Sequence, residues 1–190
     1  MSRKRLVALF VAGSMLLGGA ATALADEIVG TTGDDTLLGS ARDDLVVALE
    51  GDDIVVGFGG DDRIQGGAGD DVIAGEGSCP ASLARYCVPP GGPTGDDRLF
   101  GGPGDDRIDG DRGDDRISGQ GGADRLSGGK GADRITPGRG RDGVSSGRGR
   151  DVIRARDRKR DVITCGRGRD TVFADKRDRV HRSCERVRRR

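Results

Sequence analysis

An aspartate returns every nine residues along most of this chain, and that period constrains the fold more than any other feature of the sequence. In the most regular stretch the aspartates are Asp97, Asp106, Asp115, Asp124 and Asp133. Each is followed two residues later by Leu or Ile and preceded two residues earlier by glycine. Because self-similarity at a fixed period is the signature of solenoids and arrays, we expect one small unit to be stacked many times.

The same frame extends upstream and downstream of this stretch. It gives five units before residue 75 and ten after residue 94, with one extra residue inserted before Asp161 and one fewer before Asp178. The position two residues after the aspartate is Leu, Ile or Val in all fifteen units. This position is therefore the candidate core of the fold.

Several units fit one nine-residue pattern, G-G-x-G-x-D-x-U-x, in which U is a large aliphatic residue. The matches at every fixed position are residues 66–74 (GGAGDDVIA), 101–109 (GGPGDDRID) and 128–136 (GGKGADRIT). The chain thus resembles the RTX, or haemolysin-type, calcium-binding repeat family. The resemblance implies an all-β fold, a parallel β-helix or β-roll with two nine-residue units in each turn, interrupted here by one loop.

The residue types suit that fold. Glycine tolerates positive φ and close backbone approach, so the first six positions of a unit are expected to turn. The last three, x-U-x, are expected to form a short strand whose middle side chain points inward. At the spacing of neighbouring strands, fifteen units give about seven turns and a rod of roughly 35 Å.

A core of one aliphatic residue in nine is thin, and glycine loses much conformational entropy on folding. Stacked turns would also bring aspartates close together. Calcium would offset both the small core and the repulsion between aspartates. It takes six to eight carboxylate and carbonyl oxygens, and its binding energy becomes folding energy. The resemblance implies several ions between consecutive turns, with these residues as ligands: Asp53, Asp62, Asp71, Asp97, Asp106, Asp115, Asp124, Asp133, Gly60, Gly69, Gly95, Gly104, Gly113, Gly122 and Gly131. The alternative, that Asp and Gly are only turn formers, does not explain their fixed phase.

The chain divides into five segments. Residues 1–25 are expected to be a signal peptide, with a basic start, an apolar stretch and Ala23-Leu24-Ala25 as the cleavage site. A membrane anchor is the alternative reading. The remaining segments are repeats at 26–74, an insertion rich in Cys and Pro at 75–94, the best-formed repeats at 95–136, and basic degenerate repeats with a C-terminal cap at 137–190. We expect a secreted product without a transmembrane segment once the signal is cleaved.

Four cysteines predict two disulfides in an oxidising compartment. Cys79 and Cys87 lie within the insertion, where a metal site is the less favoured alternative because no histidine is near. Cys165 and Cys184 lie about one turn apart, so a disulfide between them would staple the last turn.

The charges are strongly divided along the chain. Residues 26–140 contain 24 acidic and 11 basic residues, a net charge of −13, whereas residues 141–190 contain 8 and 18, a net charge of +10. We expect the C-terminal arginines to pair with nearby aspartates and replace some of the calcium. Arginines on one face are either a solvated surface or a contact for an extracellular polyanion, with these candidates: Arg98, Arg116, Arg134, Arg188, Arg189 and Arg190.

No catalytic constellation stands out. The single histidine, His181, has no partners for a zinc site, and no phosphate-binding loop or nucleophile elbow is present. The sequence therefore predicts a calcium-binding protein with a structural, adhesive or surface-associated role and no enzymatic activity. A polyanion-binding module, with calcium only structural, is the second hypothesis, and no specific nucleic-acid partner is indicated.

Overall fold

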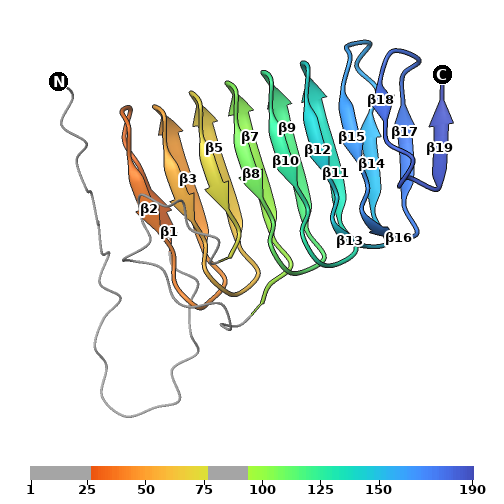
Figure 1. Cartoon of the computed structure of the whole chain (residues 1–190). Coiled ribbons are helices and arrows are strands. Elements are labelled where there is room, and N and C mark those ends of the chain that lie inside the picture. The colour runs from red at the N-terminus through yellow and green to blue at the C-terminus, as the bar shows by residue number, and fades with distance from the viewer. Residues whose placement is uncertain (1–26, 77–93) are drawn as a thin grey trace, which may run out of the picture.

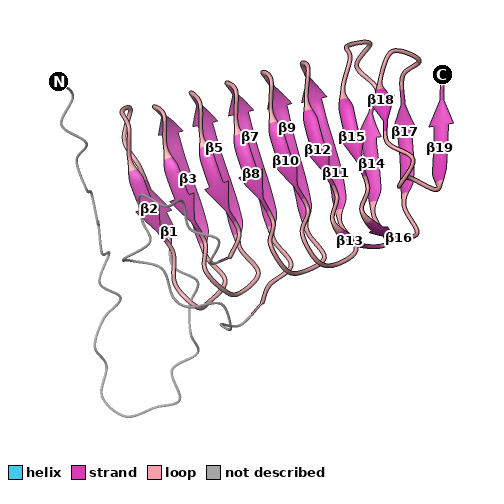
Figure 2. Ribbon diagram, viewed as in Figure 1, coloured by secondary structure: helices cyan, strands magenta, loops and turns pink. Residues whose placement is uncertain are grey.

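The computed structural model describes residues 27–76 and 94–190, which wind into a solenoid of parallel strands (Figure 1). Successive strands alternate between two long sheets that face each other, and the N- and C-terminal strands lie at opposite ends. The described residues contain strands and loops but no helix (Figure 2). The expected signal peptide and the Cys79–Cys87 pair lie outside the described residues.

The first long sheet has nine strands in the described part of the chain. In spatial order they are β1 (Glu27–Val29), β3 (Leu45–Glu50), β5 (Arg63–Ala68), β7 (Arg98–Pro103), β9 (Arg116–Gly121), β11 (Arg134–Arg139), β14 (Val152–Ala155), β17 (Thr171–Ala174) and β19 (Arg186–Arg189).

The second long sheet has eight strands, and a third sheet has two. The second contains β2 (Thr36–Leu38), β4 (Ile54–Val56), β6 (Val72–Ala74), β8 (Arg107–Asp109), β10 (Arg125–Ser127), β12 (Gly143–Ser145), β15 (Val162–Thr164) and β18 (Arg179–Val180). The small sheet pairs β13 (Arg148–Gly149) with β16 (Arg167–Gly168). The described residues thus complete eight turns and begin a ninth, slightly more than expected.

The aliphatic position of each unit forms the core, as predicted. Ile117 in β9, for example, pairs with Leu99 in β7 and with Ile135 in β11. The buried aliphatic residues at this position are Leu37, Val46, Val55, Ile64, Ile73, Leu99, Ile108, Ile117, Leu126, Ile135, Val144, Ile153, Ile163 and Val172. Val180, in the last turn, and Ile28, in the first strand, are partly exposed while they pack on the same core.

The interruption of the repeat does not disturb the stacking of turns. β5 pairs directly with β7, which places Ile64 opposite Leu99, and β6 pairs with β8. All of these pairings are parallel and keep the aliphatic position in register. The turns on the two sides of the insertion are therefore stacked like any other neighbours.

Five strands of the first sheet are six residues long, instead of the expected three. The pairing continues into the turn, where Gly102 lies opposite Gln120 and Gly138 opposite Gln120 on the other side. The turns are stacked as regularly as the strands, so their backbones form hydrogen bonds along the roll as well.

The C-terminal end is fastened by side chains. Cys165 and Cys184 form the predicted disulfide, with their Cα atoms 5.1 Å apart. The ring of Phe173 lies beside the guanidinium carbons of three arginines, at 5.2 Å from Arg156, 5.6 Å from Arg188 and 5.8 Å from Arg154. These contacts join β14, β17 and β19 on the outside of the first sheet.

Candidate metal centre

The aspartate of every described unit is buried. None of the fifteen is more than 5% exposed: Asp35, Asp44, Asp53, Asp62, Asp71, Asp97, Asp106, Asp115, Asp124, Asp133, Asp142, Asp151, Asp161, Asp170 and Asp178. A buried carboxylate is costly unless its oxygens are paired. The partners of these oxygens therefore decide what the turns can do.

One carboxylate oxygen is paired in a regular way. The backbone N–H of Asp97 donates to Oδ1 of Asp115 at 2.9 Å, and that of Asp115 donates to Oδ1 of Asp133 at 3.0 Å. Across the interruption, the N–H of Asp62 donates to Oδ1 of Asp97 at 2.8 Å. Each aspartate from Asp53 onward thus joins its own turn to the preceding one in its row.

The other oxygen is left over. Oδ2 is buried without a hydrogen-bond partner in Asp53, Asp62, Asp71, Asp97, Asp106, Asp115, Asp124, Asp133, Asp142, Asp151, Asp161 and Asp170. The first two units differ, because Oδ2 of Asp35 accepts from Thr31 Oγ1 at 3.0 Å and Oδ2 of Asp44 accepts from the Ser40 N–H at 2.6 Å. An unpaired, buried carboxylate oxygen is suited to bind a cation wherever the turn leaves space beside it.

The first glycine of the unit makes room for this oxygen. A Cβ placed on Gly101 would overlap Oδ2 of Asp106 and lie 3.0 Å from the carbonyl oxygen of Gly119 in the next turn. The same holds at Gly110, for Oδ2 of Asp115 and the carbonyl of Gly128. Neither Gly101 nor Gly110 has φ in the left-handed region, so glycine is needed there for space. The carboxylate and a carbonyl of the following turn share this space.

The glycines predicted as ligands, at the fourth position of the unit, also have a conformational role. Positive φ is found at Gly60, Gly69, Gly104, Gly113, Gly122 and Gly131. A Cβ on Gly104 would overlap the carbonyl of Gly69, and one on Gly122 would overlap that of Gly104. Gly95, without positive φ, packs in the same way on Gly60. These residues allow the turns to stack closely.

The first glycine of the unit, five residues before the aspartate, is not among the residues predicted from the sequence. Its recurrence at Gly57, Gly66, Gly101, Gly110, Gly119 and Gly128 was visible in the sequence. Glycine is common throughout the repeat, so its recurrence at this position does not by itself indicate a role. The predicted aspartates and the predicted glycines do lie in the same turns.

Burial raises the pKa of these carboxyl groups, and the neighbouring aspartates raise it further. The pKa of Asp62 and of Asp115 rises to about 8. That of Asp97, Asp106 and Asp133 rises to about 7. The hydrogen bond from the preceding turn opposes the shift without cancelling it. Without a cation, the buried carboxyl groups retain protons near neutral pH.

The residues present fit calcium. Among residues 27–76 and 94–190, no group of three or more His, Cys, Asp or Glu side chains is placed to hold a metal ion, so carboxylates alone cannot supply a site. Calcium accepts six to eight oxygens and takes backbone carbonyls as readily as carboxylates. A turn that presents one unpaired Oδ2 beside glycine carbonyls supplies this mixed set of donors.

The predicted replacement of calcium by arginine is wrong. Oδ2 of Asp142, Asp151, Asp161 and Asp170 has no hydrogen-bond partner, and Arg141, Arg150, Arg160 and Arg169 are exposed. An arginine next to an inward-facing aspartate in the turn points outward, because neighbouring side chains alternate in direction. Spacing alone did not reveal this.

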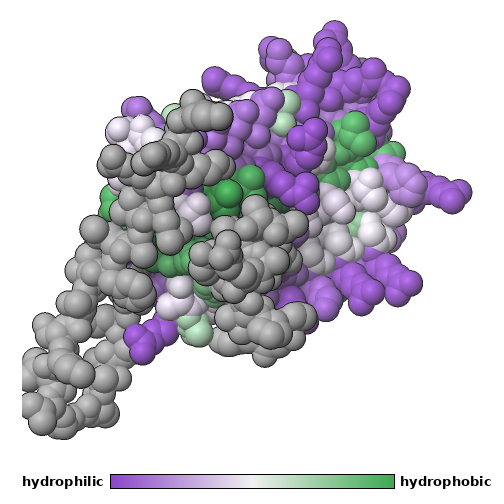
Figure 3. All heavy atoms as spheres, turned by 60° about the vertical axis from the view of Figure 1, so that its left-hand side comes forward, coloured by the Kyte–Doolittle hydropathy of each residue, from purple (hydrophilic) through white to green (hydrophobic). Residues whose placement is uncertain are grey.

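Arginines instead form rows on the outer faces of the sheets. Arg63, Arg98, Arg116 and Arg134 lie opposite one another in consecutive strands and are all exposed. The polyanion candidates of the C-terminal strand are already in contact with the protein, since Arg188 lies over Phe173 and Arg189 Nη1 donates to the Asp175 carbonyl at 2.9 Å. Figure 3 shows hydrophilic side chains projecting around the molecule, with apolar atoms exposed between them.

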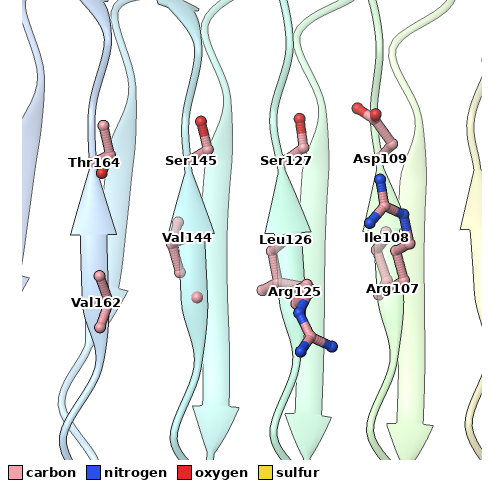
Figure 4. A pocket seen from close by; sticks show the side chains of 11 residues that line it. Arg107, Ile108, Asp109, Arg125, Leu126, Ser127, Val144, Ser145, Val162 and Thr164 are labelled. Atoms are coloured by element: carbon pink, nitrogen blue, oxygen red, sulfur yellow. The ribbon is translucent and has the colours of Figure 1, made fainter.

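The outer face of the second sheet has a shallow hollow of about 340 Å³ over β8, β10, β12 and β15. Figure 4 shows Arg107 turned toward Asp109 of its own strand, whereas Arg125 points away from the row of hydroxyl side chains formed by Ser127, Ser145 and Thr164. A Cβ on Gly143 would meet nothing closer than 3.9 Å. The hollow therefore lies where Gly143 has no side chain, and arginine and hydroxyl groups surround it.

A roll of parallel strands whose glycine turns hold unpaired carboxylates is a calcium-binding β-roll. The model of the RTX calcium-binding nonapeptide repeat matches four copies in this chain, at residues 21–55, 56–78, 92–126 and 118–153. The chain therefore belongs to the RTX calcium-binding nonapeptide repeat family. No curated protein matches it. No helix in residues 27–76 and 94–190 is long and apolar enough to cross a membrane.

Proposed function

We propose that this protein is exported and folds into its roll when it meets calcium outside the cell, where it has a structural or adhesive role. The series of buried Oδ2 atoms without partners carries this proposal. The core adds only one aliphatic side chain per unit, while each unit also buries a carboxylate. Calcium binding then contributes directly to folding.

The residues have distinct roles in this coupling. The inward aliphatic residues hold the two sheets together, and Oδ1 of each aspartate aligns consecutive turns. Oδ2 and the glycine carbonyls remain for the ion, which offsets the repulsion between stacked carboxylates. Without calcium, these groups must be protonated or hydrated, and both alternatives oppose the packed turn at neutral pH.

Export rests on the sequence and on the chemistry of the ion. Residues 1–25 have the pattern of a cleaved signal peptide. The Cys165–Cys184 disulfide is of a kind that persists in oxidising compartments. Calcium sites of extracellular modules work at roughly 10⁻⁴–10⁻³ M, which matches a protein that folds only after it leaves the cell.

The test is a calcium titration of the mature chain from chelator to about 10 mM, a range that covers extracellular-type sites. Circular dichroism should show a cooperative gain of β structure, and magnesium should not reproduce it because it demands a smaller, octahedral site. A complete β signal in chelator would overturn the coupling of calcium to folding. Mass analysis of the secreted product would locate the cleavage site.

A second candidate function is binding of an extracellular polyanion on the arginine rows. The observation in its favour is the register of Arg98, Arg116 and Arg134, which gives one exposed cation per strand at a spacing of about 4.8 Å. Retention on heparin should fall with salt and drop when these three arginines are replaced by Gln. Arg42, Arg160 and Arg177 are exposed away from this row, so their replacement by Gln is the control.

A further inference from the structure

The residue at the first position of the unit is not glycine in every turn. Glycine stands beside seven aspartates with an unpaired Oδ2, at Gly57, Gly66, Gly75, Gly101, Gly110, Gly119 and Gly128. Six other units carry a buried side chain at this position, at Ala48, Pro137, Ser146, Ala155, Cys165 and Ala174. Gly30 and Gly39 also occupy it, but the Oδ2 atoms of their aspartates, Asp35 and Asp44, are already paired. The seven glycine turns with an unpaired Oδ2 are consecutive along the roll, so they are segregated from the turns that carry a side chain.

A side chain at this position changes what the turn can hold. In the glycine turns a Cβ would overlap the aspartate Oδ2, as at Gly57 with Asp62 and at Gly119 with Asp124. A Cβ is present at Ala48 and in every unit from Pro137 onward. The space that joins Oδ2 to the next turn's carbonyl is thus taken by carbon, which cannot coordinate calcium.

The ends of the roll are stabilised by the protein itself. At the N-terminal end, Thr31 and Ser40 satisfy Oδ2 of Asp35 and Asp44. At the C-terminal end, Glu185 Oε2 accepts from the Asp170 N–H at 2.9 Å, where an aspartate of a further turn would otherwise be needed. The Cys165–Cys184 disulfide and the arginines around Phe173 act on the same turns.

We infer that calcium enters only the seven glycine turns, those of Asp62, Asp71, Asp97, Asp106, Asp115, Asp124 and Asp133, and that residues 137–190 fold without it. This inference rests on the proposed calcium-coupled folding and divides it along the chain. Asp53, which the repeat pattern includes among the ligands, is excluded because Ala48 occupies its turn. The basic C-terminal section then serves as a preformed end on which the calcium-dependent turns stack.

Hydrogen exchange of the whole mature chain, with and without calcium, tests this division. In chelator, amides of residues 137–190 should remain protected while those of residues 57–136 exchange freely, and calcium should protect the central block. Equal loss of protection in both sections on chelation would overturn the inference. If chelation changes nothing anywhere, the proposed function itself fails, so the two failures are distinguishable.

A matched pair of variants tests the role of the first position. Gly119→Ala places in a central turn the methyl group that Ala155 has naturally, so less calcium should bind at saturation than in the wild-type chain. Gly121→Ala, two residues away, is the control, because a Cβ there meets nothing within 4 Å. Wild-type calcium content in Gly119→Ala would overturn the inference. If Gly119→Ala unfolds the central block, residues 137–190 should still show their protection in chelator.

Discussion

The backbone N–H of Asp97 donates a 2.9 Å hydrogen bond to Oδ1 of Asp115, and Oδ2 of Asp115 is left buried without a hydrogen-bond partner. This relationship separates the two oxygens of one side chain. Oδ1 joins consecutive turns, whereas Oδ2 keeps its charge available. Aspartate is the shortest side chain that can do both, and an amide can do only the first.

Asp115→Asn should therefore weaken calcium binding while it preserves the bond between turns. An amide oxygen still accepts from Asp97 but contributes no charge, so we expect calcium to be bound at least about tenfold more weakly at this turn, or about 1.4 kcal/mol. Calorimetric titration measures the change. Asp114→Asn is the control, since this neighbouring side chain is exposed and its Oδ1 accepts only from the Ala132 N–H. Equal effects of the two substitutions would contradict the assignment.

Stability should depend on pH in opposite directions with and without calcium. The pKa of Asp62 and Asp115 is raised to about 8 in the folded chain, from a value near 4 in the unfolded chain. A raised carboxyl pKa means that the folded state holds more protons, so in chelator the free energy of unfolding should fall as pH rises from about 4 to about 8. Circular dichroism in chelator at several pH values measures this, because the β signal should be strongest near pH 4 and should decrease as pH approaches about 8.

Calcium reverses the trend because it competes with those protons. The calcium-free central turns are unfolded at pH 7 and their carboxyl groups ionise at about pH 4, so calcium-coupled folding at pH 7 should release few protons into a weakly buffered solution. The apparent affinity should fall as pH drops below about 5, where the carboxyl groups of the unfolded chain begin to bind protons. Magnesium at the same concentration is the control. Substantial proton release at pH 7 would show that the turns are already folded, with protonated carboxyl groups, before calcium binds.

Ile117→Ala should destabilise the calcium-loaded roll by about 2–5 kcal/mol, because it leaves a cavity between two stacked neighbours. Ile117 is 2% exposed and lies between Leu99 and Ile135. Ile28→Ala should cost less, since Ile28 is only partly buried in the first strand. Denaturant unfolding at saturating calcium compares them, and a larger effect at Ile28 would contradict the packing described here.

Reduction of the Cys165–Cys184 disulfide should destabilise the C-terminal section by about 3 kcal/mol, the chain-entropy value for a loop of this size. The two cysteines are 19 residues apart in sequence. Hydrogen exchange of residues 137–190 in chelator, with and without reductant, measures the effect. As a control, exchange in a Cys165→Ser, Cys184→Ser variant should not respond to reductant. Unchanged exchange in the wild type would show that the disulfide does not stabilise this section.

Phe173→Leu should loosen β19 by roughly 1–2 kcal/mol, since cation–π contacts at exposed sites contribute about 0.5–1 kcal/mol each. The ring lies near Arg154, Arg156 and Arg188, and Leu keeps the apolar bulk without the aromatic face. Exchange of the Val187 and Arg188 amides reports on β19. Phe100→Leu is the matched control on the same face, where one arginine, Arg63, lies over the ring.

The nine-residue period predicted the main features of the fold because each unit repeats the same environment. A single inward position in a short strand must be apolar, so Ile117 and its counterparts identified the core without further information. The same frame placed every aspartate in a turn. The disulfide followed from the distance of about one turn between Cys165 and Cys184.

Other features depend on the contact between turns and could not be inferred from one unit. The division of labour between Oδ1 and Oδ2 of Asp115 requires the adjacent turn. The space beside Gly101 is defined by Asp106 and by Gly119, from two different turns. The spacing of the arginines after Pro137 predicts pairing with the aspartates, whereas these arginines are exposed and point away from them.

The pairing of β5 with β7 across the interruption has a consequence for how such a protein can change over time. The hydrogen bond between Asp62 and Asp97 spans 35 residues of sequence yet matches those that span 18. The contacts between neighbouring turns therefore do not depend on the length of the segment that connects them. A segment can be inserted, lengthened or exchanged at this point without disturbing the stacked turns. The only cost is the entropy of closing the loop, and this cost grows slowly with loop length. The connection between residues 75 and 94 is therefore the place where the fold tolerates insertion of a new segment.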